Sequence, residues 1–376
     1  MLFIKFIIAL CLVAQVLSQA WHAGSSQNTI LGVTVGKTTS EVYAVGYMPD
    51  VGGFLLYSAD RSSSNTNTIR TGGAINMDVA ISKDGNTVCV AGANSLTCGP
   101  SGANWSPVHS APYSVVSQNV EPLGNSGFVA VGRFNSVNGI AVSSDSGATW
   151  TLHDIGASLD NGHYARYGAF PSASTFYVTT GNWPFASDAK LTNGNVARIS
   201  SRLSVFYDVG DNTPQITFMS ARQLLGTYPG GIWKTTDGGN TWSQVYDSAG
   251  KHYINQISCI DDNNCFAVGE DAKSCLILAT TDGGANWVTK FSKKGPHSLH
   301  AVNMVSATEI FVGGGSPSIG PYKDKEIVGD WYHSTDGGAT WSLTQFNGYG
   351  YDMSFKNGVG YGTAVFKKHT DIWIYQ

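Results

Sequence analysis

A short pattern that recurs along the chain constrains its fold more than any other feature. It reads "SSDSGATW" at 143–150, "TTDGGNTW" at 235–242, "TTDGGANW" at 280–287 and "STDGGATW" at 334–341. The gaps between the final tryptophans are 92, 45 and 54 residues, so the first gap is about twice the second. A worn copy, "GPSGANW", ends 45 residues before the first full copy ends. A period in the mid-forties is typical of chains built from repeated propeller blades.

Each repeat contains four short runs that favour β-strands. Around the third copy these runs are "INQISCIDDN", "NCFAVGED", "SCLILATTDGG" and "NWVTKFS". Glycine, aspartate or asparagine follows each run, as expected for strands joined by tight turns. Charged residues make up only 13 % of the chain and glycines number 45, which disfavours long amphipathic helices. The sequence therefore predicts an all-β fold, with one β-propeller of four-stranded blades over residues 19–376.

The number of blades follows from the runs that stand third in each repeat. These are "LLYSAD", "LTCGP", "AVSSD", "ARISS", "WKTTD", "LATTD", "YHSTD" and "DIWIYQ". The literal count is eight blades, and seven remains open if one unit is miscounted. The last run lacks a fourth strand, which the N-terminal residues "WHAGSS" can supply. Pairing of the two chain ends would close the ring and remove its free sheet edges.

The N-terminal residues 1–18 have the features of a cleaved secretory signal. Lys5 precedes an apolar run from Phe6 to Leu17 that is too short to span a bilayer, and small residues follow. We therefore expect a secreted protein without a membrane span. Export favours disulfides, and Cys259–Cys265 and Cys89–Cys98 are the preferred pairs. Cys275 is then left over, and a Cys265–Cys275 pair competes because its spacing is similar.

Repetition assigns the aspartate of the pattern a structural role. Catalysis needs one carboxylate in one place, whereas a fold element is needed once per blade. The carboxylate can accept hydrogen bonds from its own turn, the glycine can adopt positive φ, and the tryptophan can pack between sheets. A calcium loop would need several oxygen ligands, so we expect no metal here and no cofactor. The residues assigned to this structural role are Asp145, Trp150, Asp237, Trp242, Asp282, Trp287, Asp336 and Trp341.

The pattern resembles the Asp-box, also called the bacterial neuraminidase repeat. That repeat occurs in sialidases, sortilin-type receptors, xyloglucanases and the photosystem II assembly-factor propellers. The unit "CFAVGEDAKSCLILATTDGGANW" is most similar to the last group. The resemblance implies a propeller whose boxes lie on the face opposite the ligand-binding loops. It also implies a scaffold that binds a partner polypeptide, although fold alone does not define function.

Three long connections are candidates for a binding face. They cover residues 153–166, 180–195 and 313–330, and long insertions in a regular array usually lie on the functional face. Their polar and aromatic residues make a candidate ligand-binding set, consisting of His163, Tyr164, Arg166, Trp183, Lys190, Tyr322 and Asp324. From this set we expect a non-catalytic monomer that binds a protein or a glycan. No basic stripe is present, so a nucleic-acid partner is not expected.

A glycoside hydrolase is the alternative function. Such an enzyme needs two carboxyls about 5–10 Å apart, and Asp160 and Asp188 from the first two long connections form a candidate pair. A sialidase would need three carboxylate-binding arginines and an Arg-Ile-Pro motif, and the chain has no such motif. One glycosylation sequon is present, at Asn104, inside the worn copy of the pattern.

Overall fold

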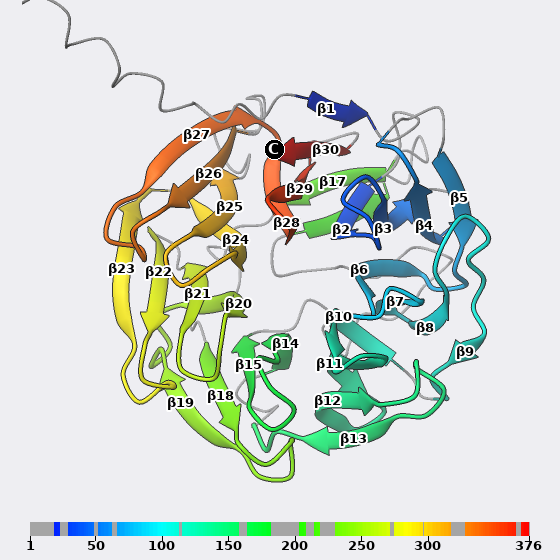
Figure 1. The fold of residues 1–376 in the computed structure, drawn as a ribbon. Coiled ribbons are helices and arrows are strands. Elements are labelled where there is room, and N and C mark those ends of the chain that lie inside the picture. Colours follow the sequence, from blue (N-terminus) through cyan, green and yellow to red (C-terminus); the bar gives the residue numbers. More distant parts are fainter. Residues whose placement is uncertain are drawn as a thin grey trace, which may run out of the picture.

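The computed structural model describes residues 19–22, 29–48, 52–61, 66–112, 115–157, 164–181, 203–207, 214–218, 230–270, 274–295, 297–316, 328–365 and 370–375. Within these ranges the regular elements are thirty β-strands, and no helix is among them. Figure 1 shows the strands arranged as blades around a central axis. The predicted all-β propeller is confirmed. In the described part of the chain, no helix has the length and apolar character needed to cross a membrane.

The first three blades run outward from the axis as antiparallel meanders. Blade 1 consists of β2 (Thr29–Val35), β3 (Val42–Met48), β4 (Gly52–Ser58) and β5 (Thr66–Arg70). Blade 2 consists of β6 (Ile75–Ile81), β7 (Thr87–Ala93), β8 (Ser95–Pro100) and β9 (His109–Ser110). Blade 3 consists of β10 (Val115–Leu123), β11 (Gly127–Phe134), β12 (Val137–Ser143) and β13 (Thr151–Asp154). A single β10–β7 pair, Val116 with Ala93, links blades 2 and 3 into one sheet.

The remaining four blades follow the same plan. Blade 4 consists of β14 (Tyr164–Ala169), β15 (Phe176–Gly181), β18 (Gly231–Thr235) and β19 (Ser243–Asp247). Blade 5 consists of β20 (Tyr253–Cys259), β21 (Cys265–Glu270), β22 (Ser274–Thr280) and β23 (Val288–Lys294). Blade 6 consists of β24 (Ser298–Met304), β25 (Ile310–Ser316), β26 (Val328–Ser334) and β27 (Ser342–Asn347). Blade 7 consists of β28 (Tyr349–Lys356), β29 (Val359–Val365), β30 (Thr370–Tyr375) and β1 (Gln19–His22).

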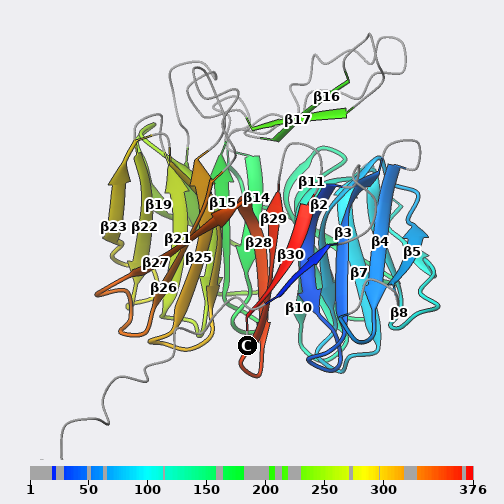
Figure 2. The same cartoon turned by 90° about the horizontal axis from the view of Figure 1, so that it is seen from above.

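The described strands thus form seven blades, which corrects the literal count of eight. The run "ARISS" lies outside the described residues, within the connection from β15 to β18 of blade 4. That connection also contains the two-stranded sheet of β16 (Leu203–Tyr207) and β17 (Pro214–Phe218). Figure 2 shows β16 and β17 beyond the blades, on the side away from the C-terminus. An insertion of about one blade's length therefore produced the doubled tryptophan spacing.

The ring closes through the two ends of the chain, as predicted. β1 pairs antiparallel with β30, and the register runs from Gln19 opposite Ile374 to His22 opposite Asp371. β1 is therefore the outermost strand of blade 7, whose other strands come from the C-terminal end. The closing strand begins slightly earlier than the predicted "WHAGSS". Closure covers the edge of β30, which would otherwise be open to pairing with another chain.

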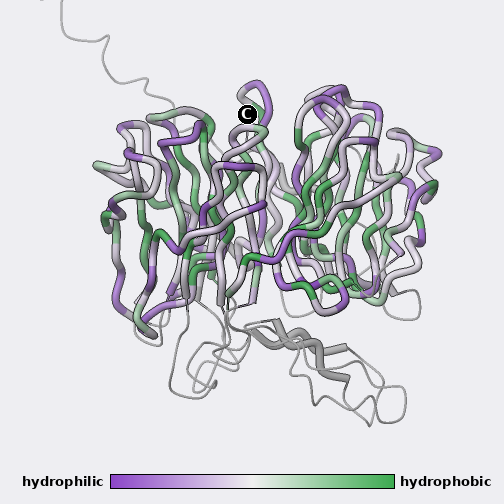
Figure 3. Tube along the Cα trace, turned by 90° about the horizontal axis from the view of Figure 1, so that it is seen from below, coloured by the Kyte–Doolittle hydropathy of each residue, from purple (hydrophilic) through white to green (hydrophobic). Residues whose placement is uncertain are grey.

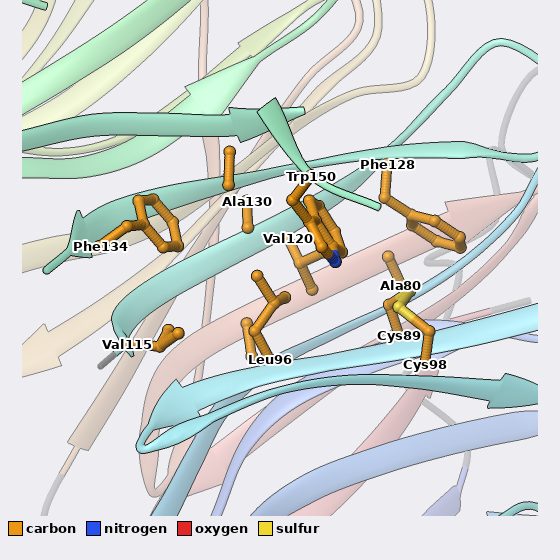
Figure 4. Close-up of a cluster of buried hydrophobic side chains, with 12 residues drawn as sticks. Ala80, Cys89, Leu96, Cys98, Val115, Val120, Phe128, Ala130, Phe134 and Trp150 are labelled. Atoms are coloured by element: carbon orange, nitrogen blue, oxygen red, sulfur yellow. A yellow bond between two sulfur atoms is a disulfide. The ribbon is translucent and has the colours of Figure 1, made fainter. Parts of the chain in front are cut away.

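Hydrophobic cores lie at the junctions between blades. Each buried cluster combines residues of two adjacent blades, because both faces of a blade are apolar and pack on a neighbour. Figure 4 shows the junction of blades 2 and 3, where Trp150 lies close to Phe128 and to the Cys89–Cys98 pair. Figure 3 shows hydrophobic segments along the strands and hydrophilic segments at many of the turns.

The two faces of the ring differ in the connections they carry. We call the face with the first-to-second and third-to-fourth strand connections the aspartate face, because the four full copies of the pattern join β12 to β13, β18 to β19, β22 to β23 and β26 to β27. The opposite face carries the second-to-third and fourth-to-first connections, and we call it the loop face. The connections 158–163, 182–229 and 317–327 all belong to the loop face by their place in the strand order.

Candidate functional site

Each full copy of the pattern forms the same hydrogen-bonded turn, which we call an aspartate loop (residues 143–150, 235–242, 280–287 and 334–341). In the first loop, the Ser143 hydroxyl donates to Asp145 Oδ1 (2.8 Å) and accepts from the Gly147 N–H (2.9 Å). Asp145 also accepts the N–H of Thr149 at Oδ1 (2.9 Å) and its hydroxyl at Oδ2 (2.6 Å). The equivalent atoms make the same contacts in the other three loops, with the Asn286 amide replacing a hydroxyl in the third.

These donors keep the loop carboxylates ionised. Hydrogen bonds from Thr149 lower the pKa of Asp145 to about 2, and those from Thr340 lower the pKa of Asp336 to about 2. Hydrogen bonds, first from Thr235 and from Asn286 respectively, also lower the pKa values of Asp237 and Asp282. A carboxylate that is ionised at neutral pH and bonded at both oxygens to its own turn is a poor proton donor. The geometry supports a structural role.

Each aspartate loop also contacts the preceding blade. Trp150 of blade 3 lies in the core cluster of blades 2 and 3, and its Nε1 donates to the Gly147 carbonyl (3.0 Å). Gly147 has φ +85°, and a Cβ there would lie 2.2 Å from Cys98 Sγ of blade 2. Glycine is therefore required both by the turn and by the approach of the neighbouring blade. The other loop tryptophans likewise pack with residues of blades 3, 4 and 5, and they are Trp242, Trp287 and Trp341.

Most of the candidate binding residues lie outside the described part of the chain. Those residues are Asp160, His163, Trp183, Asp188, Lys190, Tyr322 and Asp324. The structure therefore places only their connections, which all belong to the loop face. Tyr164 and Arg166 are described, and both lie on β14 at the start of blade 4. Tyr164 is half-buried at the loop-face end of that strand.

Arg166 is buried among residues of several blades. Its side chain is 1 % exposed, and its Nε donates to Gln118 Oε1 of blade 3 (3.1 Å). Burial lowers the pKa of the guanidinium, and the tyrosines nearby include Tyr167 and Tyr351. Tyr351 stacks on His300 with ring centroids 4.0 Å apart. Arg166 therefore forms part of a polar and aromatic layer inside the ring, out of reach of a ligand that stays on the surface.

A cavity of about 480 Å³ lies on the axis of the ring. Residues at the C-terminal ends of all seven innermost strands line it, so it lies toward the aspartate face. Three carboxyl side chains reach its wall, Asp78 from β6, Glu121 from β10 and Asp352 from β28. Its size is within the usual range for ligand sites, but its lining is more polar than in most of them.

Every innermost strand departs from regular pairing near this cavity. A register shift interrupts the pairing of β2, β6, β10, β14, β20, β24 and β28 with the next strand of the same blade. A bulge adds a residue and redirects the side chains beside it. At four of the seven shifts, the redirected side chain accepts a backbone N–H from the innermost strand of the next blade. We call these side chains the axial acceptors, and they are Asp78, Asn119, Gln256 and Asp352.

The three carboxyls at the cavity wall, Asp78, Glu121 and Asp352, all have raised pKa values, and we call these side chains the axial carboxyls. Desolvation raises the pKa of Asp78 to about 6, although hydrogen bonds from Val120, Val79 and Asn119 oppose this shift. Desolvation, followed by the charge of Asp78, raises the pKa of Glu121 to about 8. The same two causes raise the pKa of Asp352 well above its usual range. Their pKa values are therefore shifted in the opposite direction to those of the aspartate-loop carboxylates.

Sequence reasoning did not identify the axial carboxyls, although a signal for them exists. Asp78 stands in "INMDVAI", Glu121 in "SQNVEPL" and Asp352 in "GYDMSF", each within a strand in which at least half of the residues are buried. A charged residue within a buried strand is unusual and marks a group with a partner or a function. Only the ring topology reveals that three such residues from distant parts of the sequence share one cavity.

The described part of the chain contains two disulfides and one further cysteine. Cys89–Cys98 joins β7 to β8 and Cys259–Cys265 joins β20 to β21, the two pairs that the sequence favours. Cys275 is a buried thiol, so the competing Cys265–Cys275 pair is absent, and burial raises the pKa of the thiol to about 12. Two disulfides indicate an oxidising environment. Within the described ranges, no group of three or more acidic, histidine or cysteine side chains is arranged to hold a metal ion.

Asn104 is exposed in the turn between β8 and β9, whereas the adjacent Trp105 is buried and its Nε1 donates to the Val88 carbonyl (3.0 Å). Glycosylation of Asn104 stays a prediction, because Asn104 and Ser106 of the sequon are exposed while Trp105 between them is buried. Treatment of the protein produced through a eukaryotic secretory pathway with a peptide N-glycosidase should reduce its mass, and the Asn104→Gln variant should show no such reduction. An unmodified mass for the wild-type protein produced in this way would contradict this.

Comparison with known proteins shows the fold and no family. No family model matches the chain, and no curated protein sequence matches it. Among solved structures, YCF48 from Cyanidioschyzon merolae has a TM-score of 0.57 at 12 % identity, covering 95 % of this chain and 99 % of that one. A structure of YCF48 bound to D1 peptide has a TM-score of 0.58 at 13 % identity, covering 95 % and 96 %. A GH74 xyloglucanase from Xanthomonas campestris has a TM-score of 0.53 at 13 % identity, covering 95 % and 53 %.

Proposed function

We propose that this chain is a secreted, non-catalytic β-propeller that binds a polypeptide partner on its loop face. The observation that carries the proposal is the distribution of its connections. The long connections 158–163, 182–229 and 317–327 all join strands at one face, whereas the aspartate face has short turns that pack on neighbouring blades. Loops on a rigid scaffold are where binding residues concentrate. The four aspartate loops, which share one hydrogen-bond pattern, are on this proposal Asp-box repeats.

A polypeptide is favoured over a glycan as the partner for two reasons. One similar propeller, YCF48, has been solved with a bound D1 peptide, and it covers nearly the same length as this chain. The candidate residues Lys190, Tyr322 and Asp324 also combine both charges with an aromatic ring, a mixture that suits charged and amide groups of a peptide. A non-catalytic role is supported by the aspartate loops, whose carboxylates are bonded within their own turns.

The binding test uses a displayed random-peptide library and a glycan array with the chain from residue 19 to 376. We expect enrichment of a peptide family, and at least a tenfold loss of affinity for it in Trp183→Ala and Tyr322→Ala. Lys83→Ala, which changes an exposed side chain at the aspartate face, is the control and should bind as the wild type does. Specific capture of glycans without enrichment of peptides would contradict the peptide proposal.

The alternative, a glycoside hydrolase, has its own test. The same protein is incubated with xyloglucan and other plant and microbial polysaccharides, and new reducing ends are measured. We expect none. Product release that disappears in Asp160→Asn or Asp188→Asn would replace the binding proposal with the hydrolase, because the loss would identify the carboxyl pair.

A further inference from the structure

The two disulfides have the same place in strand pairing and differ in their burial. Cys89 lies opposite Cys98 in the β7–β8 register, and Cys259 lies opposite Cys265 in the β20–β21 register. Both cysteines of the first pair are fully buried. In the second pair Cys265 is fully buried, whereas Cys259 is half-buried. The first pair is therefore an internal comparison for the second, because each bridges directly opposed residues and only the access differs.

The Cys89–Cys98 pair is enclosed by the next blade. A Cβ on Gly147 of the first aspartate loop would lie 2.2 Å from Cys98 Sγ and 3.5 Å from Cys89 Sγ. Trp150 of the same loop packs in the cluster that contains the pair, and Figure 4 shows it close by. A thiolate must contact a disulfide sulfur in order to attack it. The aspartate loop therefore shields this pair while the protein is folded.

Cys259 has an open side on the axial cavity. It is the last residue of β20 and is one of the residues that line the cavity, whose volume of about 480 Å³ accommodates a small organic thiol. The aspartate loop of blade 6 packs on a different residue of blade 5, since a Cβ on Gly338 would lie 2.8 Å from the ring of Phe266. The second disulfide joins the first and second strands of its blade, so it lies one strand nearer the axis than the first disulfide.

The turn between Cys259 and Cys265 has hydrogen bonds that close it independently of the disulfide. Asp261 Oδ1 accepts the Asn264 N–H (2.8 Å), and Asp261 Oδ2 accepts the Asn264 side-chain amide (2.8 Å). The Ile260 N–H donates to the Asn264 carbonyl (3.1 Å). These bonds keep the two cysteines opposite each other, so the thiols formed by reduction stay within reach of reoxidation.

The same turn is also fastened to blade 4. Asp262 Oδ2 accepts the hydroxyls of Ser172 (3.2 Å) and Thr175 (2.9 Å). The Tyr177 hydroxyl donates to the Asp262 carbonyl (2.7 Å). Because a second blade holds the turn, we expect the fold to persist when the disulfide is reduced.

Acidic side chains predominate around the approach to Cys259. Five carboxyls belong to the turn or share the cavity wall with Cys259, and they are Asp78, Glu121, Asp261, Asp262 and Asp352. The basic residues in the described cavity lining are Lys83 and Lys356. A surface with an excess of negative charge lowers the local concentration of anionic reagents and raises that of cationic ones. The surroundings therefore select among thiols by their charge.

We propose that Cys259–Cys265 is a site of reversible thiol–disulfide exchange, which small cationic or uncharged thiols reduce in the folded protein while Cys89–Cys98 stays intact. The thiolate of the reductant attacks Cys259 Sγ and forms a mixed disulfide, and Cys265 leaves as a thiolate that takes up a proton. A second thiol of the reductant then attacks the reductant sulfur of the mixed disulfide and releases Cys259 as a thiol. Two electrons pass to the protein, and the reductant leaves as its own disulfide.

The first test treats the folded chain of residues 19–376 with dithiothreitol at neutral pH. Samples are quenched in acid, denatured and labelled with N-ethylmaleimide, and mass spectrometry of the peptides locates the thiols. Cys275 is labelled throughout, since it is a thiol before reduction. Label should reach Cys259 and Cys265 at least tenfold faster than Cys89 and Cys98, with an unchanged circular dichroism spectrum.

The control is the double variant Cys259→Ala with Cys265→Ala, which should gain no label in the same period. After removal of the reductant, cystamine should restore the Cys259–Cys265 pair and leave Cys275 a thiol. Reduction of both disulfides at one rate, or reduction only in denaturant, would overturn the proposal.

The second test compares two small thiols of equal length and opposite charge, cysteamine and 2-mercaptoethanesulfonate. At equal thiolate concentration and low salt, cysteamine should reduce the second disulfide several-fold faster, and added salt should diminish this difference. The mixed disulfide trapped by acid should be on Cys259. A mixed disulfide on Cys265 would contradict the assigned point of attack, and equal rates for the two thiols would contradict the selection by charge.

Discussion

The aspartate of each aspartate loop accepts hydrogen bonds at both carboxylate oxygens from donors of its own loop. Asp336 Oδ1 and Oδ2 receive three donors, from Ser334 and from the backbone and hydroxyl of Thr340. Replacing the carboxylate leaves these donors to water and loosens the contact of the loop with blade 5. Repetition of the motif was enough to predict this role from sequence, because four copies with one chemistry at blade spacing are incompatible with a single active site.

Asp336→Ala should therefore lower the melting temperature by a few degrees at neutral pH and leave partner binding unchanged. The pKa of Asp336 is lowered to about 2, so its contribution is present above the unfolded value near 4 and lost as pH falls toward 2. The cost of the substitution should shrink accordingly in acid. Thr335→Ala, at the neighbouring exposed position, is the control. Lost binding with an unchanged melting temperature would contradict the structural role.

Among the four aspartate loops, Ser146 is the one residue other than glycine that has a positive φ. It has φ +62°, whereas the equivalent Gly238, Gly283 and Gly337 each have φ +71°. The N–H at this position makes the same bond in all four loops, from Ser146 to the Ser126 carbonyl in the first, so the side chain is not needed for that contact. A non-glycine residue is strained in this region by about 1 kcal/mol.

Ser146→Gly should thus raise the melting temperature slightly, because relief of strain exceeds the added entropy of the unfolded chain. Ala148→Gly in the same loop is the opposite control, since Ala148 is not among the residues with positive φ and gains only flexibility. It should lower the melting temperature. Thermal unfolding of the two variants side by side measures the difference, and equal shifts of the same sign would show that φ at residue 146 is not the cause.

The shared role of the axial acceptors could not be predicted from the sequence. Asp78, Asn119, Gln256 and Asp352 belong to three residue types, and each stands in a different short sequence. Their common role arises from a bulge in each innermost strand, and a bulge leaves no consistent pattern in the sequence. The loop-face candidates were identified from the lengths of their connections and from their polar or aromatic side chains. Arg166, chosen in this way, is in fact buried, because it sits within β14 rather than in the connection before it.

At the scale of the element, individual strands were easier to predict than the number of blades. The runs "INQISCIDDN" and "NCFAVGED" correspond closely to β20 and β21, because each run of strand-forming residues ends in turn residues. The literal count of eight blades was too high, because residue spacing cannot distinguish a blade from an insertion between β15 and β18, and the alternative of seven that the sequence left open is the one found. Counting only units that have four strands, the first of them buried, would have given seven blades.

The junction of blades 6 and 7 depends on one close contact between elements. Blade 7 has no aspartate loop, since its outer strand β1 comes from the other end of the chain, and the buried cluster there is the smallest. Trp331 on β26 fills the space against Gly362 on β29, where a Cβ would lie 1.9 Å from Trp331 Cη2. The absence of a side chain at residue 362 therefore permits the packing of the tryptophan.

Gly362→Ala should destabilise the protein by about 3 kcal/mol, the upper end for an overpacked core, because neither strand backbone can withdraw. Trp331→Phe in the same chain should recover part of the loss, since the smaller ring leaves room for the methyl group. Chemical unfolding of the two single variants and the double variant measures this coupling. Strictly additive losses would show that the ring and the methyl group do not collide.

At the scale of the molecule, two classes of carboxyl make opposite contributions to the pH dependence of stability. The aspartate loops have lowered pKa values and lose their contribution in acid, whereas the axial carboxyls have raised values and become unfavourable in base. Stability should therefore be greatest in mildly acidic solution, between the two titrations. The first class fixes blades 3 to 6 each to the blade before it, and the second surrounds the axial cavity.

Closure by β1 gives the last prediction. A chain that begins at residue 19 retains the strand that pairs with β30, whereas one that begins at residue 23 lacks it. The shorter chain should melt at a lower temperature and self-associate, because the backbone groups of β30 become an unpaired edge. Calorimetry and light scattering of the two chains measure both effects.

A peptide of residues 19–28 distinguishes loss of pairing from loss of length. Added in excess to the shorter chain, it should occupy the open edge by strand addition and restore both the melting temperature and the monomeric state. A peptide of the same composition in scrambled order should have a weaker effect, because its side chains no longer match the register of β30. If the two chains melt alike without peptide, the ring is held by its junction cores and the closing strand contributes little.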